Sequence, residues 1–324
     1  MAYAIDIIED SFNKTKKLLF PIRKSFWLKM GFVSLFSGRA GSGSYSSGYN
    51  SNQIESFPED VKSTIGEINN NFLFNLKKYG YFIGIFISLV LLIVLFFSYI
   101  FSIFKFMFIQ GVLEKKINIK RSFNKNKKLG ASLFVFRIYL GLISIGLMLL
   151  IFSPLIFAFL NGALQFFNYL LLIPMLFSFF ILIFIVRIVN FIVMNFLVII
   201  MYNKDVSIRS SWNHFKKITS EKKVEIFLFW IMKIVLGIVG GIAIAIIVIG
   251  FLIAFGIIGA ILAFIFYFMY AASNSYLILG TGIVFGVILF LFFIYAVAVV
   301  SLPVDVFFQY YSINMIKKLE KGKN

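Results

Sequence analysis

Long apolar runs alternate along the chain with short polar segments that are rich in lysine and asparagine. Runs such as 83–104 and 234–255 reach the roughly 20 residues that an α-helix needs to cross a hydrocarbon layer of about 30 Å. The pattern predicts an all-α, polytopic integral membrane protein. We expect six crossings, over 22–37, 80–109, 131–152, 169–201, 226–249 and 277–301.

Two of these runs depart from the length of a single crossing. The run 22–37 is short and contains Lys29, so it could also be an interfacial or half-crossing helix. The stretch 226–270 is too long for one crossing, and two crossings would move the basic C-terminal segment to the opposite face. We therefore expect one crossing, followed by a separate apolar element around 251–270 that lies in or dips into the outer leaflet.

Composition supports the membrane class and narrows the chemistry. Of 324 residues, 61% are hydrophobic and 14% are charged, far less charge than a soluble domain of this size carries. The chain has no cysteine, which excludes disulfides and thiolate chemistry, and one histidine with 13 acidic residues leaves little material for a metal site or for acid–base catalysis. We therefore expect no enzyme activity, no metal and no cofactor.

Basic residues gather in four segments between the apolar runs. The segments 1–29, 112–130, 202–225 and 312–324 hold 23 of the 31 lysines and arginines. Positively charged loops remain on the cytoplasmic side of a membrane, so these four segments are predicted to be cytoplasmic and both termini with them. This favours the plasma membrane of a prokaryote, crossed several times.

Each basic segment contains one copy of a box with the pattern Ser-(Phe/Trp/Ile)-Asn-x-x-Lys-Lys. The copies begin at Ser11, Ser122, Ser211 and Ser312. Their spacing predicts one membrane domain over 1–324, built from three hairpin repeats over 1–111, 112–201 and 202–324. Within the first repeat, the Gly/Ser-rich stretch 38–57 is expected to be a flexible external loop. The basic residues Arg137 and Lys233 occupy matching positions in the second and third repeats, each followed by Ile-x-Leu-Gly.

On a helix, the asparagine and the two lysines of a box share one face and the serine points the other way. We therefore expect amphipathic helices at the cytoplasmic interface, with Asn118 and Ser207 as N-caps of two of them. An amide beside two ammonium groups suits the phosphate of an anionic lipid headgroup. The candidate residues are Asn13, Lys16, Lys17, Asn124, Lys127, Lys128, Asn213, Lys216, Lys217, Asn314, Lys317 and Lys318. Simple anchoring by positive charge, or docking of a protein partner, would explain the same boxes, whereas nucleic acid is not expected as a partner.

Three further features concern the apolar runs themselves. Arg187 and Asp305 are candidates for an intramembrane polar pair that lines a pathway, although a structural or interfacial position is equally compatible. Pro303 should kink the last helix. The stripe Gly237-x-x-x-Gly241-x-x-x-Ala245 should let two helices approach closely.

The N-terminal third carries a resemblance to a known group of proteins. The residues are Tyr3-Ala4-Ile5-Asp6, Thr15-Lys16-Lys17, Phe20-Pro21, Trp27-Leu28-Lys29 and the Gly/Ser-rich stretch after Phe36. With its basic, aromatic loops between helix pairs, the chain resembles uncharacterised archaeal multi-span proteins related to the membrane domain found beside glycerophosphodiester phosphodiesterases. The resemblance implies a helical membrane domain without the catalytic barrel of those enzymes.

Two functions remain open from the sequence. The first is a non-enzymatic scaffold or accessory protein that binds lipid or a partner protein, with a homo-oligomer as one form of partner. The second is a transporter or channel for a small solute or lipid. A transporter should bring Arg187 and Asp305 together at a polar cavity between hairpins, and a scaffold should have a packed apolar centre with the boxes at one face.

Overall fold

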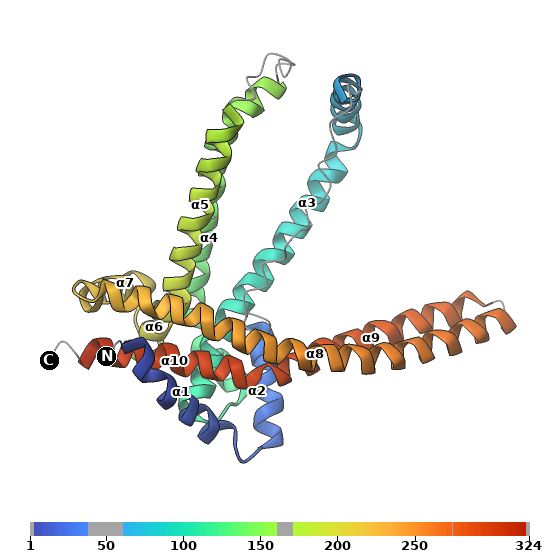
Figure 1. The fold of residues 1–324 in the computed structure, drawn as a ribbon. Coiled ribbons are helices and arrows are strands. Elements are labelled where there is room, and N and C mark those ends of the chain that lie inside the picture. Colours follow the sequence, from blue (N-terminus) through green and yellow to red (C-terminus); the bar gives the residue numbers. More distant parts are fainter. Residues whose placement is uncertain (1–2, 38–60, 161–170, 274, 322–324) are drawn as a thin grey trace.

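The computed structural model describes residues 3–37, 61–160, 171–273 and 275–321, and the regular elements in these ranges are all helices (Figure 1). The predicted loop over 38–57 lies outside the described residues. The elements are α1 (Tyr3–Leu19), α2 (Lys24–Phe36), α3 (Val61–Glu114), α4 (Ile119–Leu160), α5 (Leu172–Ile192), a π-helical turn η3 (Val193–Leu197), α6 (Val198–Lys204), α7 (Ile208–Thr219), α8 (Lys223–Ser273), α9 (Tyr276–Val300) and α10 (Leu302–Lys321).

Three long arms extend from a common base (Figure 1). One arm is α3, the second is the antiparallel pair of α4 and α5, and the third is the antiparallel pair of α8 and α9. The shorter helices α1, α2, α6, α7 and α10 gather at the base. Apolar side chains along the arms are exposed, for example Phe86, Leu150 and Ile246 at 67–70%. Since no protein covers these side chains, a lipid environment is what makes them stable.

Five helices in the described part of the chain are long and apolar enough to cross a membrane, so the chain is a multi-pass membrane protein. They are Gly80–Glu114, Ile119–Ala158, Leu172–Lys204, Lys223–Ser273 and Tyr276–Val300. The predicted crossing over 22–37 coincides with α2, which has 13 residues and is therefore about 20 Å long. A helix of that length does not span a hydrocarbon layer. The interfacial or half-crossing alternative for 22–37 therefore fits α2, and the total of six crossings is not confirmed.

The expectation of a separate apolar element over 251–270 is wrong. These residues belong to α8, which runs without interruption from Lys223 to Ser273. The stretch contains no proline, and in lipid an unbroken helix is the way to satisfy every backbone donor and acceptor. With 51 residues, α8 is about 77 Å long, so it tilts strongly or extends beyond a hydrocarbon layer of about 30 Å.

Pro303 has a stronger effect than the expected kink. It is the second residue of α10, and α9 has already ended at Val300. Proline has no backbone N–H, so it cannot continue the hydrogen-bonding pattern of α9 but is well accommodated in the first turn of a new helix. The carbonyl of Ser301 accepts from the N–H groups of Val304 and Asp305, each at 3.1 Å, and thereby starts α10. The break lets α10 turn into the base.

The packed core lies in the base, where the ends of all three arms meet. Helix α1 contributes Ala4, Ile7, Ser11, Thr15 and Leu18 along one face, at the three- and four-residue spacing of an α-helix. These residues pack against α10, whose Tyr311 donates a hydrogen bond from its hydroxyl to the carbonyl of Ala4 at 3.0 Å. Burial of this phenol raises its pKa. The first and last helices of the described chain are therefore held side by side.

The glycine stripe does not mediate the close helix contact that the sequence suggests. A methyl group added at Gly237 or Gly241 would meet nothing within 4 Å. The close approaches occur elsewhere: a Cβ atom at Gly240 would lie 3.0 Å from Val304, and one at Gly130 would lie 2.5 Å from the Ile103 side chain. The sequence spacing identifies a stripe of small residues on one face of the helix. Which face of the helix packs closely depends on where the neighbouring helix lies.

Candidate functional site

The serine of every box is buried. Ser11, Ser122, Ser211 and Ser312 are between 0 and 2% exposed. Three of these hydroxyls donate to the carbonyl four residues earlier in the same helix: Ser11 to Ile7, Ser211 to Ser207 and Ser312 to Phe308. The hydroxyl thereby has a hydrogen-bond acceptor within its own helix. A neighbouring helix can then pack closely against the serine, whereas a larger polar side chain would hold the two helices apart.

The amide and ammonium groups of the first three boxes lie on the opposite, exposed side. The exposed residues are Asn13, Lys16, Lys17, Asn124, Lys127, Lys128, Asn213, Lys216 and Lys217. Two of the lysines lie over the aromatic residue of their own box: Lys127 over the Phe123 ring at 5.5 Å and Lys216 over the Trp212 ring at 6.0 Å. The three boxes lie on three different helices, α1, α4 and α7, and neither the groove nor the cavity described below contains their asparagines or paired lysines.

The fourth box differs from the others in the position of its asparagine. Asn314 is 5% exposed and joins α10 to α1, donating to the Ser11 hydroxyl at 2.8 Å and accepting from the Lys14 ammonium at 2.8 Å. Lys318 is half-buried and pairs with Asp6 at 2.5 Å, while Lys317 is exposed. The fourth box therefore contacts the first, and its asparagine is not available to a headgroup.

This difference leads to a prediction for two asparagines at the same position of the box. Replacement Asn314→Ala should lower the free energy of unfolding by about 1–2 kcal/mol, because a buried hydrogen bond between two helices is lost. Replacement Asn13→Ala, at an exposed position, should change it by less than about 0.5 kcal/mol. Denaturant titration of the protein in detergent would measure both. Equal effects of the two replacements would contradict the structural role of Asn314.

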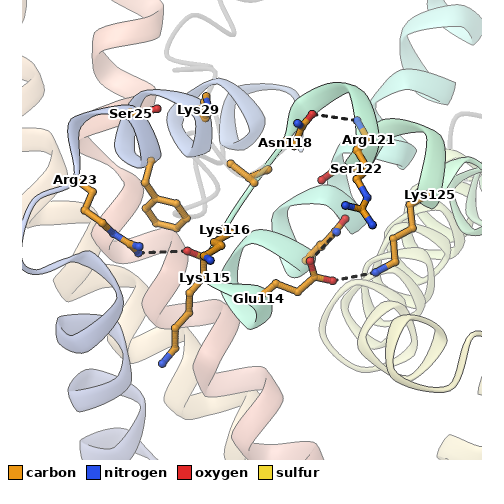
Figure 2. A pocket seen from close by; sticks show the side chains of 13 residues that line it. Arg23, Ser25, Lys29, Glu114, Lys115, Lys116, Asn118, Arg121, Ser122 and Lys125 are labelled. Atoms are coloured by element: carbon orange, nitrogen blue, oxygen red, sulfur yellow. Dashed lines mark hydrogen bonds and ion pairs between the residues drawn. The ribbon is translucent and has the colours of Figure 1, made fainter.

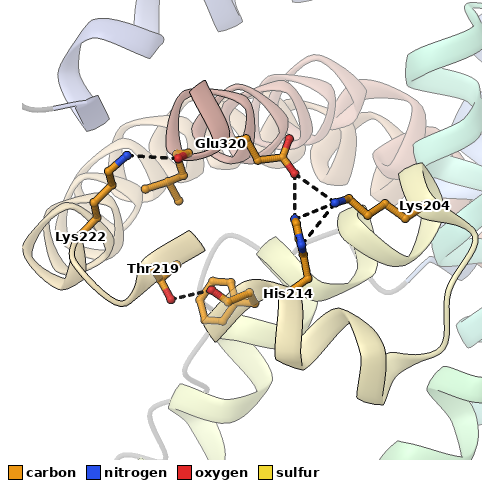
Figure 3. A network of polar contacts seen from close by, with 7 residues as sticks. Lys204, His214, Thr219, Lys222 and Glu320 are labelled. Atoms are coloured by element: carbon orange, nitrogen blue, oxygen red, sulfur yellow. Dashed lines mark hydrogen bonds and ion pairs between the residues drawn. The ribbon is translucent and has the colours of Figure 1, made fainter. Parts of the chain in front are cut away.

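The third box is joined to the end of α10 by a polar network (Figure 3). The Glu320 carboxylate lies 3.0 Å from Nε2 of His214 on α7 and 3.9 Å from the Lys204 ammonium at the end of α6. Lys222 donates to the carbonyl of Leu319 at 3.2 Å. His214 is thus engaged in holding α7 to α10, and the first, third and fourth boxes all border the same helix.

The second box forms the beginning of a long helix and not a separate amphipathic one. It lies in the first turns of α4, which continues to Leu160. Asn118 caps this helix, as predicted, by accepting a hydrogen bond from the N–H of Arg121 at 3.2 Å. Ser207 occupies the N-cap position of α7 with an extended backbone, but its side chain makes no capping hydrogen bond.

A basic groove opens beside the second box (Figure 2). Its volume is about 680 Å³, and it lies between the start of α2, the end of α3 and the start of α4. Six exposed basic side chains and one carboxylate, that of Glu114, line it, a formal excess of five positive charges. The basic residues are Arg23, Lys29, Lys115, Lys116, Arg121 and Lys125.

The one carboxylate of the groove is already well satisfied. Glu114 accepts from Lys125 at 2.9 Å, from the Gln110 amide at 2.9 Å and from the Tyr202 hydroxyl at 3.0 Å. It therefore neutralises one cation and leaves the charge of the other five uncompensated within the groove. The N-terminus of α4 faces the same space and adds the positive end of a helix dipole. This arrangement suits an anion with several oxygen atoms, such as a phosphate ester.

Sequence reasoning counted these basic residues in their segments but did not single them out. Arg23 and Lys29 are about 90 positions from Lys115 and Arg121, and none of the asparagines and paired lysines of the boxes lines the groove. The feature of the sequence that could have pointed to the groove was the concentration of basic residues in the segment 112–130. The two segments are brought together by the packing of α2 against α3, in which Phe26, Met30 and Val33 of α2 are buried.

Arg187 and Asp305 do not form a pair. Arg187 is exposed on α5 and does not line the cavity that contains Asp305. Asp305 is 5% exposed in the first turn of α10, where it accepts from the Ser34 hydroxyl at 2.6 Å and from the Ser301 hydroxyl at 3.4 Å. Its cavity, at the junction of the arms, has a volume of about 390 Å³ and also contains Lys105, Arg137 and Lys233.

Comparison with known proteins identifies a family but no activity. Residues 2–322 match the model of a family of unknown function, DUF7544. No curated protein and no solved structure matches the chain. The resemblance to the membrane domain beside glycerophosphodiester phosphodiesterases, and an archaeal source, are not among these findings and remain hypotheses. Because the match covers nearly the whole chain, this multi-pass membrane protein belongs to the DUF7544 family.

Proposed function

We propose that the protein is a non-enzymatic scaffold of a prokaryotic plasma membrane that binds the phosphate of anionic lipid headgroups at its cytoplasmic face. The basic groove between α2, α3 and α4 is the observation that carries this proposal. Its five uncompensated positive charges lie within one concave surface of about 680 Å³. Charges spread over loops would anchor the protein equally well, whereas a groove of this kind selects one bound anion.

The expected position of the groove relative to the bilayer supports the same function. It lies at the ends of α3 and α4, the ends that meet the base, and the four basic segments are there as well. With the base on the cytoplasmic side, as the positive-inside rule requires, the groove would face the headgroups of the inner leaflet. Each basic residue near an anionic surface then contributes a favourable interaction of about 1 kcal/mol.

The groove can be tested against the boxes with two matched triple variants. Replacing Arg23, Lys116 and Arg121 by glutamine should weaken binding of one anionic phospholipid about a hundredfold, because three attractive charges are removed. Replacing Lys16, Lys127 and Lys216 by glutamine removes the same net charge from three exposed box positions and should leave that lipid bound. Native mass spectrometry of the purified protein, titrated with phosphatidylglycerol and with phosphatidylcholine, measures both.

Three results would reject the groove as a headgroup site. One is a wild-type protein that binds the two lipids equally, since the charge of the groove would then have no consequence. Another is an equal loss of lipid in both triple variants, which would mean that net charge acts without a defined site. The third is loss of lipid only in the box variant, which would move the site to the boxes.

A transporter or channel is the second candidate function. The observation that favours it is the polar cavity around Asp305, which lies at the junction of the arms. Flux of a solute into proteoliposomes that disappears in an Asp305→Asn variant would favour transport over a scaffold. The pair of Arg187 and Asp305 that the sequence suggested for a transporter is not part of this second function, since the two residues do not meet.

A further inference from the structure

The cavity at the junction of the arms collects basic side chains from three long helices. Lys105 comes from α3, Arg137 from α4 and Lys233 from α8, and each belongs to a different arm. Among the residues that the structure describes, Asp305 of α10 is the one carboxylate that lines the cavity. Three cations and one carboxylate leave a formal excess of two positive charges. The cavity is separate from the basic groove and shares no residue with it.

This excess charge lies where water is scarce. Lys105 is 4% exposed and Asp305 is 5% exposed, and the aromatic rings of Phe101, Trp230 and Phe308 form part of the wall. Charges in such surroundings are costly unless an opposite charge compensates them. Basic residues near the end of a membrane helix commonly reach out to the headgroups. Here, however, three of them line one common cavity.

Arg137 provides the clearest sign of what this space accommodates. Its guanidinium donates to the Ser102 hydroxyl at 3.3 Å and to the Met194 sulfur at 3.5 Å, both of which are uncharged acceptors. In the described part of the chain no carboxylate forms an ion pair with it. A guanidinium has five N–H donors in a planar fork, a geometry that matches two oxygen atoms of a phosphate or carboxylate.

Lys233, the counterpart of Arg137 in the third repeat, is positioned by a neutral group. It donates to the side-chain oxygen of Asn195, which lies in the π-helical turn η3, and its ammonium is 5.5 Å from the centre of the Phe308 ring. Single π-helical turns within α-helices occur frequently at functional sites. On α10, Gln309 follows Asp305 by four residues on the same helix face and is fully buried. Polar groups are therefore maintained at this junction at the expense of apolar packing.

We propose that this cavity is a binding site for a phosphate group, held by Arg137 together with Lys105 and Lys233. With a volume of about 390 Å³ it falls within the range of small-molecule pockets, roughly 300–1,000 Å³. The phosphate belongs either to a lipid, whose acyl chains would lie against the aromatic wall, or to free inorganic phosphate. Asp305 opposes the bound anion and limits its affinity.

The test uses purified full-length protein in a neutral detergent and follows its thermal unfolding. Inorganic phosphate is one probe, with chloride at equal ionic strength as its reference. Short-chain phosphatidic acid is the other, with short-chain phosphatidylcholine as its reference. Stabilisation should saturate with phosphate, with phosphatidic acid or with both, and the probe that acts identifies the source of the phosphate group.

Three single variants give effects of different sign. Arg137→Gln should weaken the apparent affinity at least about tenfold, because a charge-assisted hydrogen bond pair is lost. Asp305→Asn should strengthen it by a similar factor, because the opposing carboxylate is removed. Arg187→Gln removes the same charge from an exposed position outside the cavity and should leave the affinity unchanged. If Arg137→Gln does not fold, Arg137→Lys retains the charge without the planar fork and should still weaken binding.

The proposal is overturned if neither probe stabilises the protein more than its reference. It is also overturned if Arg137→Gln and Arg187→Gln have equal effects, or if Asp305→Asn weakens binding. None of these results depends on the basic groove. The proposed headgroup function could therefore be rejected while the cavity site is confirmed, and the cavity site could be rejected while the headgroup function is confirmed.

Discussion

Replacement of Phe196 by alanine should lower the free energy of unfolding by about 3–5 kcal/mol, the range found for large aromatic residues removed from a packed core. Phe196 is fully buried in the π-helical turn η3. Its ring lies 5.2 Å from that of Phe215 on α7, 5.1 Å from that of Phe229 on α8 and 6.3 Å from that of Phe191 on α5. Its removal leaves a cavity where two arms and the helix of the third box meet.

Denaturant titration in detergent, followed by tryptophan fluorescence, would measure this loss. The matched control is Phe184→Ala on α5, where the side chain is 57% exposed and should be covered by lipid or detergent in both forms. Its effect should stay within about 0.5 kcal/mol. A similar cost for both phenylalanines would mean that the base is not the packed centre of the protein.

Replacement of Gly130 by alanine should destabilise the protein by about 1–3 kcal/mol, although alanine is the better helix former. The added Cβ would lie 2.5 Å from Cγ1 of Ile103 and 2.9 Å from its Cα. A side chain can rotate away, but a backbone atom can move only with the whole of α3. The contact between α3 and α4 should therefore open, and the basic groove at the ends of these two helices should widen with it.

Gly141→Ala in the same helix is the control for this effect. A Cβ atom there would meet nothing within 4 Å, so the variant should be neutral or stabilised by up to about 1 kcal/mol through helix propensity. Gly130→Ala should thus lower the thermal unfolding temperature, whereas Gly141→Ala should leave it unchanged or raise it. A shift in the same direction would contradict the close approach of α3 and α4.

The helical membrane class could be read from the sequence because it follows from local properties. A long apolar run satisfies its backbone hydrogen bonds internally and buries its side chains in lipid, with no need for a particular neighbour. The burial of the box serines and the exposure of Asn13, Asn124 and Asn213 followed equally from helical periodicity. Pro303 marked the place where the last helical run is interrupted, although the sequence predicted a kink and the structure has a break between α9 and α10.

The predictions that failed were those that depended on a neighbour. Asn314 has the same local sequence as Asn13, yet it is buried because α1 lies against α10. Gly237 and Gly241 have the spacing of a close helix contact, but a Cβ atom added at either position would meet nothing within 4 Å. Arg137 and Lys233 were recognised as matching positions, whereas their meeting with Lys105 around one cavity was not recognised. A recurring sequence motif relates positions along the chain and carries no information on how the arms are arranged.

The sequence by itself determined that this chain forms long membrane helices separated by four basic boxes, each with a buried serine, because helix formation and amphipathicity depend on residues within a few turns of one another. Only the tertiary structure decided which polar groups meet. It joins the first box to the fourth, and it forms a basic groove from segments about 90 residues apart. It also brings one cation from each arm to a common cavity, because contacts between distant segments are set by how whole helices pack.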